Sequence, residues 1–309
     1  MTIVAGAGEL PMLWRAGAAI ARARFAADLA VVERAIPPGG SLLNLCKDRY
    51  HFALLFLAAC RRGATNLLPP SEGREDIAEV GAMFSAPPAI DDAAVQTWLA
   101  APAESSMCDA GGFASAHEAA IVFTSGSTGQ PSAYRKTWGT LEATAASSAS
   151  AVFGDSFCHV VATVPPQHMY GLEFSVMMAL NGRAAVHAGR PLFPADVAAT
   201  LDSIPAPRVL VTTPVHLRAL VGAEPVLPPL HRVICATAPL DGALAEAVER
   251  TFGCELHEVY GCTEAGSVAL RRTTRTSAWR PHSVVRVTER EGRAEISGSH
   301  LPSSQQLQD

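Results

Sequence analysis

Six consecutive small residues at 124–129 (TSGSTG) carry only hydroxyl groups or no side chain, and they follow a short apolar run, AAIVF at 119–123. None of the six can fill a hydrophobic core, so their chemistry must come from hydroxyls and backbone. Gly126 and Gly129 can adopt positive φ, which lets successive N–H groups converge on an anion. We interpret the run as a phosphate-binding loop. The alternative for such a segment is a flexible surface turn.

Four other segments with polar or conformationally special residues each come directly after an expected strand: PPQHMYG (165–171), TTPVH (212–216), ATAPL (236–240) and YGCTEAG (260–266). In an open parallel sheet, ligands bind beyond the carboxyl ends of the strands. We therefore expect these four loops to form a binding cleft beside residues 124–129. The sequence contains neither the GxxxxGK[ST] pattern of P-loop nucleotide-binding proteins nor the GxSxG nucleophile elbow of serine hydrolases.

Alternating strand and helix patterns position these loops. Short apolar runs predict strands at 158–164, 184–188, 208–213, 232–237 and 255–260, with helical segments between them. The helix that starts near Asp241 is the best defined, since Asp241 can cap its N-terminus and Gly253 follows its end. This rhythm predicts an α/β fold with mostly parallel sheets covered by helices.

The chain divides into three expected parts. Residues 1–157 form an N-terminal α/β subdomain that includes the phosphate loop, and 158–275 form a second α/β subdomain. The alternation in SVVRVTEREGRAEISGS, with a turn at Glu291 and Gly292, predicts an antiparallel hairpin within a small β subdomain at 276–309.

Composition narrows the function classes. The chain has 309 residues, 49% of them hydrophobic, and a net charge of −5 without a dense basic block, so we expect a globular protein that binds neither nucleic acid nor membrane. No long uncharged apolar segment or secretory leader is visible, which predicts a cytoplasmic protein. The seven cysteines are scattered and form no zinc-site pattern. Lysine occurs only at positions 47 and 136, so any lysine chemistry has two candidates.

The segments FTSGSTGQP, PPQHMYG and YGCTE occur in this order, and together they resemble the adenylate-forming (AMP-binding) acyl- and aryl-acid ligases. This superfamily includes acyl- and aryl-CoA synthetases, adenylation domains of peptide synthetases, and luciferases. The resemblance covers about residues 40–309, the large N-terminal portion of such an enzyme. It implies that a carboxylic acid and Mg-ATP are converted into an acyl-adenylate and pyrophosphate. The acyl group would then pass to a thiol of coenzyme A or of an acyl carrier protein.

The resemblance also assigns nucleotide and metal contacts. It implies that the β- and γ-phosphates of ATP are held by Thr124, Ser125, Gly126, Ser127, Thr128 and Gly129. Thr263 would contact the α-phosphate, and Glu264 would bind Mg²⁺, a hard cation that prefers carboxylate oxygen. Adenosine would be held by Ala236, Thr237, Ala238, Pro239, Tyr260 and Gly261, with Tyr260 stacking on adenine. Taken alone, Glu264 would be a solvated acid and Tyr260 a core residue.

His168 would lie near the incoming carboxylate and the α-phosphate, although a histidine in such a loop can also be structural. Candidates for the acyl pocket are Trp138, Met169, Tyr170, Gly171, Val215 and His216, for most of which a core position is the alternative. An aspartate late in this portion of the family binds the ribose hydroxyls. Asp309 takes that place here, but LQD departs from the usual Thr-Gly-Asp.

Two further departures concern positive charge. Gln130 and Ser132 stand where members often carry lysines, and Arg135 and Lys136 can supply charge nearby. A full member continues into a small C-terminal domain that bears a catalytic lysine, and neither Lys47 nor Lys136 sits where that lysine belongs. We therefore expect this chain alone to bind ATP but to form adenylate poorly. The alternative is a non-catalytic nucleotide or acyl-adenylate binding module, or one half of a split enzyme.

Overall fold

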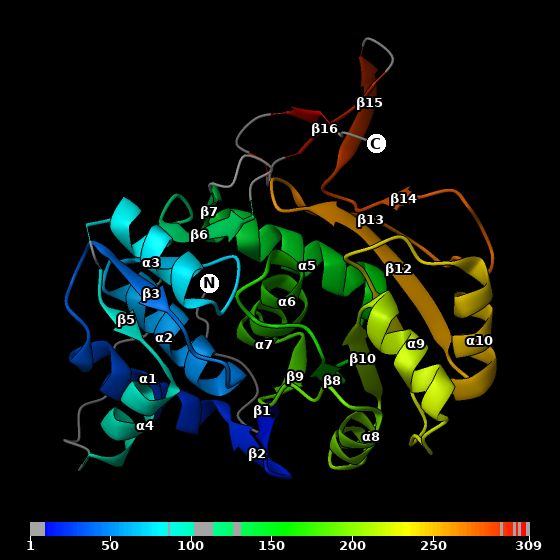
Figure 1. The fold of residues 1–309 in the computed structure, drawn as a ribbon, viewed down its shortest axis with the longest axis horizontal. Coiled ribbons are helices and arrows are strands. Elements are labelled where there is room, and N and C mark those ends of the chain that lie inside the picture. The colour runs from blue at the N-terminus through cyan, green and yellow to red at the C-terminus, as the bar shows by residue number, and fades with distance from the viewer. Residues whose placement is uncertain are drawn as a thin grey trace.

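The computed structural model describes residues 10–85, 87–101, 114–125, 131–290, 293–298, 301 and 304–306. Two helix-covered sheets lie side by side, and a small sheet projects from one end (Figure 1). The expected α/β fold with mostly parallel sheets is confirmed. No helix in these described ranges is both long and apolar enough to cross a bilayer.

The smaller α/β layer is built on a five-stranded sheet in the order β5-β3-β4-β6-β7. Its strands are β3 (Ser41–Asn44), β4 (Thr65–Leu68), β5 (Ala89–Ile90), β6 (Glu118–Thr124) and β7 (Ser132–Thr137). All neighbours pair in parallel except β6 and β7. The helices of this part are α1 (Arg22–Ala35), α2 (Arg49–Arg61), α3 (Arg74–Met83) and α4 (Asp92–Ala100). Residues 124–129 thus begin at the carboxyl end of β6.

The larger layer is a nine-stranded sheet in the order β14-β13-β12-β11-β10-β8-β9-β1-β2. Its strands are β1 (Pro11–Arg15), β2 (Ala18–Ala21), β8 (Cys158–Ala162), β9 (Ala184–His187), β10 (Arg208–Thr212), β11 (Arg232–Cys235), β12 (Glu255–Cys262), β13 (Gly266–Arg271) and β14 (Arg280–Pro281). The central strands from β12 to β1 run in parallel, and antiparallel pairs close both edges. The five strands expected between 158 and 260 are therefore confirmed.

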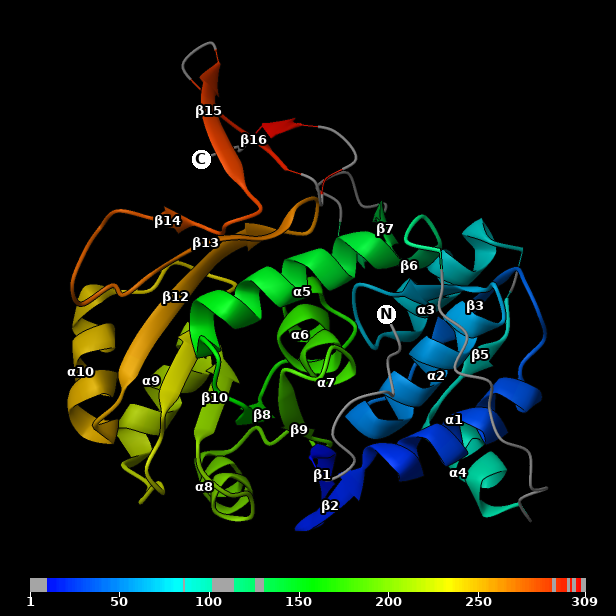
Figure 2. The ribbon, with the colours of Figure 1, turned by 180° about the vertical axis from the view of Figure 1, so that it is seen from behind.

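Helices join these strands and cover the sheet: α5 (Trp138–Phe153), α6 (Met169–Gly171), the π-helix η1 (Leu172–Met177), α7 (Met178–Leu180), α8 (Pro194–Asp202), α9 (Pro214–Ala223) and α10 (Gly242–Phe252). At α10, the Asp241 side chain accepts a hydrogen bond from the amide of Ala243, and Gly253 ends the helix in the left-handed region, as expected. Helix α5 runs across the molecule from β7 toward β12, which is also visible from behind (Figure 2). It therefore bridges the two sheets.

Two features bear on the expected three-part division, which stays a prediction. Strand β1 pairs with β9 and β2 pairs with β1, so an N-terminal segment within 1–157 belongs to the nine-stranded sheet. The expected antiparallel unit near the C-terminus is confirmed as β15 (Arg286–Arg290), β16 (Arg293–Ser297) and β17 (Gln305–Gln306). Its turn residues Glu291 and Gly292 lie outside the described residues.

One hydrophobic core joins both layers. It contains Phe52 and Phe56 of α2, Val160 of β8 and Phe174 of η1, all of them fully buried. Because α2 packs against one sheet while η1 follows a strand of the other, this shared core fixes the two sheets relative to each other. The carboxyl ends of β6, β8, β11 and β12 consequently face a common space.

Candidate active site

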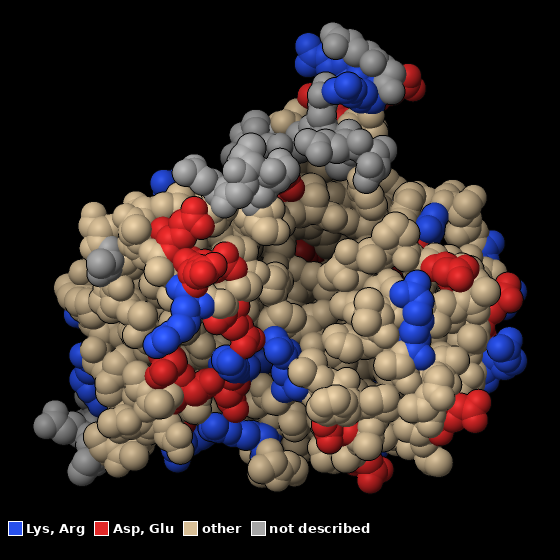
Figure 3. Space-filling view, in the orientation of Figure 1, with Lys and Arg blue, Asp and Glu red and all other residues tan. Residues whose placement is uncertain are grey.

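A cavity of about 250 Å³ opens where these strand ends meet. Its walls come from the end of β6, the segment that starts at His168, the residues after β11, and the turn between β12 and β13. It is lined by Val122, Phe123, Thr124, His168, Met169, Tyr170, Glu173, Phe174, Ala236, Thr237, Val259, Gly261, Cys262, Thr263, Gly266 and Ser267. Figure 3 shows a hollow surrounded mainly by uncharged residues, with acidic surface at depth, and Glu173 is the one acid among the described residues of the cavity lining. Three of the four expected loops contribute, whereas 212–216 does not line the cavity.

The phosphate-loop prediction is only partly visible. Thr124 ends β6 and lines the cavity, and Ser125 follows it as an exposed residue outside the lining. Gly126, Ser127, Thr128 and Gly129 lie outside the described residues, as does Asp309. The conformation of the loop itself therefore stays a prediction.

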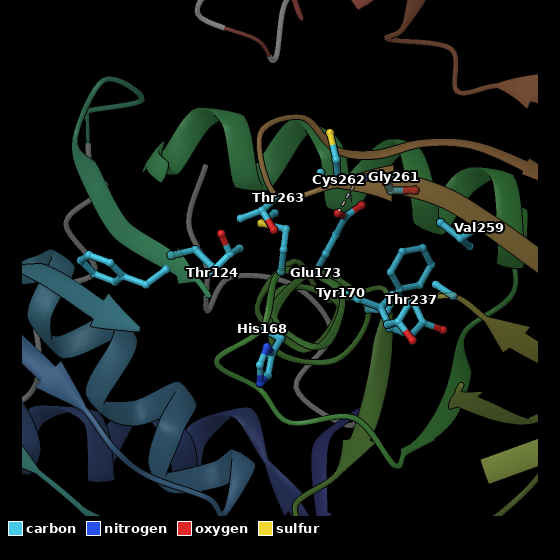
Figure 4. A pocket seen from close by; sticks show the side chains of 16 residues that line it. Thr124, His168, Tyr170, Glu173, Thr237, Val259, Gly261, Cys262 and Thr263 are labelled. Carbon is cyan, nitrogen blue, oxygen red and sulfur yellow. Dashed lines mark hydrogen bonds between the residues drawn. The ribbon is translucent and has the colours of Figure 1, made fainter. Parts of the chain in front are cut away.

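The turn between β12 and β13 carries Thr263 and Glu264. Thr263 and Gly261 line the cavity, and Figure 4 shows Thr263 across from Thr124 and above His168. The Tyr134 hydroxyl, on β7, lies near the side chains of both Glu264 and Thr124: the neighbouring Glu264 raises its pKa, and the neighbouring Thr124 lowers it. This proximity brings the end of β6 and the Glu264 carboxylate to the same place.

Glu264 is held as a carboxylate. Burial opposes its ionisation, but hydrogen bonds from its own backbone, Tyr134 and Cys262, with the attraction of Lys136, lower its pKa below the ordinary range. No group of three or more His, Cys, Asp or Glu side chains that could hold a metal occurs in the described part of the chain. A single carboxylate fits Mg²⁺, which usually binds one or two carboxylates plus substrate phosphates and keeps several waters.

His168 precedes α6 and lines the cavity. Burial lowers the pKa of its imidazole, and repulsion by Arg190 adds to this effect, while Glu72 opposes it. The imidazole is therefore neutral at neutral pH, so it can donate and accept hydrogen bonds at its two nitrogens.

The segment expected to line adenine divides in two. Ala236 and Thr237 line the cavity, whereas Ala238 and Pro239 are exposed and do not. Thr237 has a φ of 82°, an unusual conformation for a β-branched residue. The ring of Tyr260 lies 5.4 Å from that of Trp279 and is not in the lining. Its proposed stacking on adenine stays a prediction.

The acyl-pocket candidates also separate. Met169 and Tyr170 line the cavity, and the Tyr170 hydroxyl donates to the carbonyl of Ile234 at 2.9 Å. Four candidates lie elsewhere. Trp138 is buried in the core, Gly171 packs tightly against the carbonyl of Pro165, Val215 is 67% exposed, and His216 Nδ1 lies 3.0 Å from Thr163 Oγ1.

Eight lining residues were not named individually as site candidates, although two of them belong to the expected loop 260–266: Val122, Phe123, Glu173, Phe174, Val259, Cys262, Gly266 and Ser267. Most are ordinary apolar or small residues that carry no signal in the sequence. Glu173 is different, because it is the single charge in the apolar run GLEFSVMMAL. A charge inside a buried helix needs partners, and this pattern could have identified it.

The model of a protein family described as "AMP-binding enzyme" matches residues 84–293, about two thirds of the chain. Two curated relatives, both described as 4-coumarate–CoA ligase, come from Rhodobacter capsulatus and Halorhodospira halophila. The first is 33% identical over 155 residues and the second 34% identical over 166 residues. These matches cover 50% and 51% of this chain and 39% of each relative.

Solved structures share the fold at low identity. An o-succinylbenzoate coenzyme A synthetase from Bacillus subtilis, in complex with ATP and magnesium ion, has a TM-score of 0.78 at 17% identity, covering 94% of this chain and 69% of that one. An anthranilate CoA ligase in complex with anthranoyl-AMP also has a TM-score of 0.78, at 13% identity, covering 95% of this chain and 68% of the ligase. This chain therefore has the α/β fold of these solved ligases. The chain belongs to the AMP-binding enzyme family.

Proposed function

We propose that the chain binds ATP with Mg²⁺ and activates a carboxylic acid as an acyl-adenylate, with release of pyrophosphate, for transfer to a thiol. One observation carries this proposal: Thr124, His168, Thr237 and Thr263 come from four separate segments and line one cavity. Tyr134 also lies near both Thr124 and the Glu264 carboxylate, since each shifts the pKa of its hydroxyl. The start of the proposed triphosphate clamp would then lie near the proposed metal-binding acid, as the chemistry requires.

The chain's own residues orient the polyphosphate. Hydroxyls and amides from Thr124 to Gly129 hold the β- and γ-phosphates, and Thr263 donates to the α-phosphate. Glu264 holds Mg²⁺, which neutralises phosphate charge when it is bound. Ala236, Thr237 and Gly261 contact the adenosine. These contacts fix the α-phosphorus for attack from one side.

The acid binds between His168 and the apolar wall of the cavity. His168, in its neutral form, donates a hydrogen bond that orients the carboxylate toward the α-phosphate. Tyr170, Phe174 and Val259 surround the remainder of the acid with apolar surface. This lining favours acids with an apolar or aromatic body. The acceptor thiol belongs to coenzyme A, as in the names of the curated relatives, or to a carrier-protein pantetheine.

Calorimetry with MgATP tests the nucleotide site. We expect saturable binding that Thr263→Val weakens by about tenfold, since it removes a hydrogen bond to a charged group while retaining side-chain volume. Thr251→Val, the same change on an exposed residue of α10, should leave the affinity unchanged. An absence of heat with MgATP would refute the proposal.

A hydroxamate assay tests the acid activation. Fatty, benzoic and cinnamic acids are supplied with MgATP and hydroxylamine to the full-length gene product. An acid-dependent product supports a ligase. MgATP binding without product from any acid class would favour a nucleotide-binding module instead.

A further inference from the structure

Lys136 is one of two lysines in the chain, and it is 3% exposed. It lies on β7, and its Nζ donates to the backbone carbonyl oxygen of Glu264 at 2.6 Å. Tyr134 lies two residues earlier on the same strand, so both side chains share one face of β7. Tyr134 contacts the Glu264 side chain, while Lys136 contacts its backbone. Strand β7 therefore holds Glu264 at two points.

Glu173 holds the other side of the same turn. It is 1% exposed on η1, and its Oε2 accepts a hydrogen bond from the amide of Ser267 at 3.0 Å. Its Oε1 accepts one from the Ser148 hydroxyl, on α5, at 2.7 Å. Figure 4 shows the Glu173 carboxylate reaching the strand segment at Gly261 and Cys262 from below. Glu173 of η1 and Lys136 of β7 thus hold the β12–β13 turn by hydrogen bonds from opposite sides.

The two charges attract each other in a buried environment. Burial lowers the pKa of Lys136 to about 8, against the attraction of Cys262, Glu173 and Glu264. Burial raises the pKa of Glu173 to about 7, against hydrogen bonds from Ser148 and Ser267 and the attraction of Lys136. Charged groups are expensive to bury, and hydrophobic replacement of a buried pair is often neutral or stabilising. Stability alone is therefore a weak reason for this pair.

We propose that Lys136 and Glu173 are positioning residues that fix the β12–β13 turn, so that the Glu264 carboxylate is oriented to bind Mg²⁺. The inference rests on the proposed function, because it concerns the same metal ligand. The turn has two outward groups to orient, the Thr263 hydroxyl and the Glu264 carboxylate. Lys136 fixes the peptide carbonyl of Glu264, and Glu173 fixes the amide where β13 resumes.

The test compares the affinity of the 309-residue chain for ATP with Mg²⁺ and for ATP in EDTA, by calorimetry. In Lys136→Met, which keeps the length of the side chain, we expect the ratio of these affinities to fall by about tenfold, the size typical for residues that orient a metal ligand. Metal-free ATP should bind as in the wild type. Lys47→Met is the matched control, because Lys47 is the other lysine, pairs with Glu72 at the surface, and lies outside the cavity lining.

A double-mutant cycle separates positioning from stability. In a Glu264→Gln background, Lys136→Met should change the ratio less than twofold, because the ligand that it positions is already impaired. Lys136→Met/Glu173→Gln removes both charges and should unfold at a higher urea concentration than Lys136→Met alone. It should nevertheless retain the reduced Mg²⁺ effect. If Lys136→Met does not fold, this double variant carries the binding measurement.

Hydrogen exchange supplies a readout without nucleotide. Amides of residues 262–267 should exchange faster in the double variant than in the wild type, whereas amides of α10 should not change. A wild-type chain that binds no ATP would overturn the proposed function and this inference together. A wild-type chain that binds MgATP, alongside a Lys136→Met or double variant with an unchanged ratio and unchanged exchange, would overturn the inference alone.

Discussion

The Nη2 atom of Arg49 donates a hydrogen bond to the carbonyl oxygen of Ala162 at 2.9 Å. Arg49 starts α2 and is 1% exposed, while Ala162 ends β8 in the other sheet. The same guanidinium donates to the carbonyls of Val164 and Gly189 and to the Ser175 hydroxyl. Arg49 therefore fixes the start of the segment that leads to His168.

Arg49→Met should destabilise the fold by about 3–5 kcal/mol, because it leaves several buried carbonyl groups without donors. The free energy of unfolding is measured by urea denaturation. Arg218→Met, the same substitution at an exposed position of α9, should change it by less than about 0.5 kcal/mol. Equal effects of the two substitutions would contradict the role of Arg49 at the interface of the sheets.

His168→Ala should slow adenylate formation by about 10²-fold, since it removes the neutral imidazole proposed to orient the carboxylate. The hydroxamate assay measures this rate, and calorimetry should show that MgATP affinity is retained. His231→Ala provides the control, because His231 is exposed and lies outside the cavity. A normal rate in His168→Ala would assign this residue a structural role.

Gly266→Ala should be costly for two separable reasons. Gly266 has a φ of 74°, and an added Cβ would lie 3.2 Å from both Glu173 Oε2 and Thr144 Cγ2. Gly253 also has positive φ, 61°, but has open space around it. We expect Gly253→Ala to cost about 1 kcal/mol in unfolding free energy and Gly266→Ala about 2–3 kcal/mol.

The affinity for MgATP should also differ between Gly266→Ala and Gly253→Ala. Gly266→Ala should weaken MgATP binding, because the substitution pushes against the Glu173 carboxylate that holds the turn. Gly253→Ala should bind MgATP as the wild type does. If the two alanine variants lose equal stability and retain equal affinity, the crowding around Gly266 has no energetic consequence.

The stability of the wild type should depend on pH through Glu173. Burial raises the pKa of this carboxyl from 4.5 in the unfolded chain to about 7 in the folded protein. The folded state therefore binds the proton more tightly. The resulting stabilisation is fully present below the unfolded pKa and is lost as pH rises through the folded pKa.

Relative to Glu173→Gln, the wild type should thus lose about 3 kcal/mol of unfolding free energy between the two pKa values, measured by urea denaturation across that range. Glu246→Gln, on the exposed face of α10, should follow the wild type at every pH. Parallel curves for wild type and Glu173→Gln would show that this carboxyl does not titrate differently on folding.

Local sequence patterns were strong enough to predict most of the strands and helices. The strands from β8 to β11 are short, mainly apolar runs, and α10 has both an N-cap and a terminal glycine, so short-range physics sufficed to locate them. Strands β1 and β2 were not anticipated as part of the nine-stranded sheet, because β1 joins it by pairing Leu13 with the sequence-distant Val186 of β9, and β2 joins it through β1. No local pattern specifies a partner at that distance.

The candidate site divides in the same way. Thr124, His168, Thr237 and Thr263 belong to distinctive segments after strands, and the cavity contains all four. Trp138, Val215 and His216 come from plausible neighbouring segments but do not line it. Whether a side chain faces a cavity depends on its direction from the backbone, which the residue type does not set.

The sequence by itself determined the alternation of strands and helices, the family and the loops that meet at one edge, because periodicity and strand-end placement are local properties. Only the tertiary structure decided that Lys136 reaches the backbone of Glu264 and that Glu173 reaches Ser267. The first contact joins residues that are 128 positions apart in the sequence, and the second joins residues that are 94 positions apart. Such pairs form when separate elements pack into one core, since burial then forces each charge to find a polar partner.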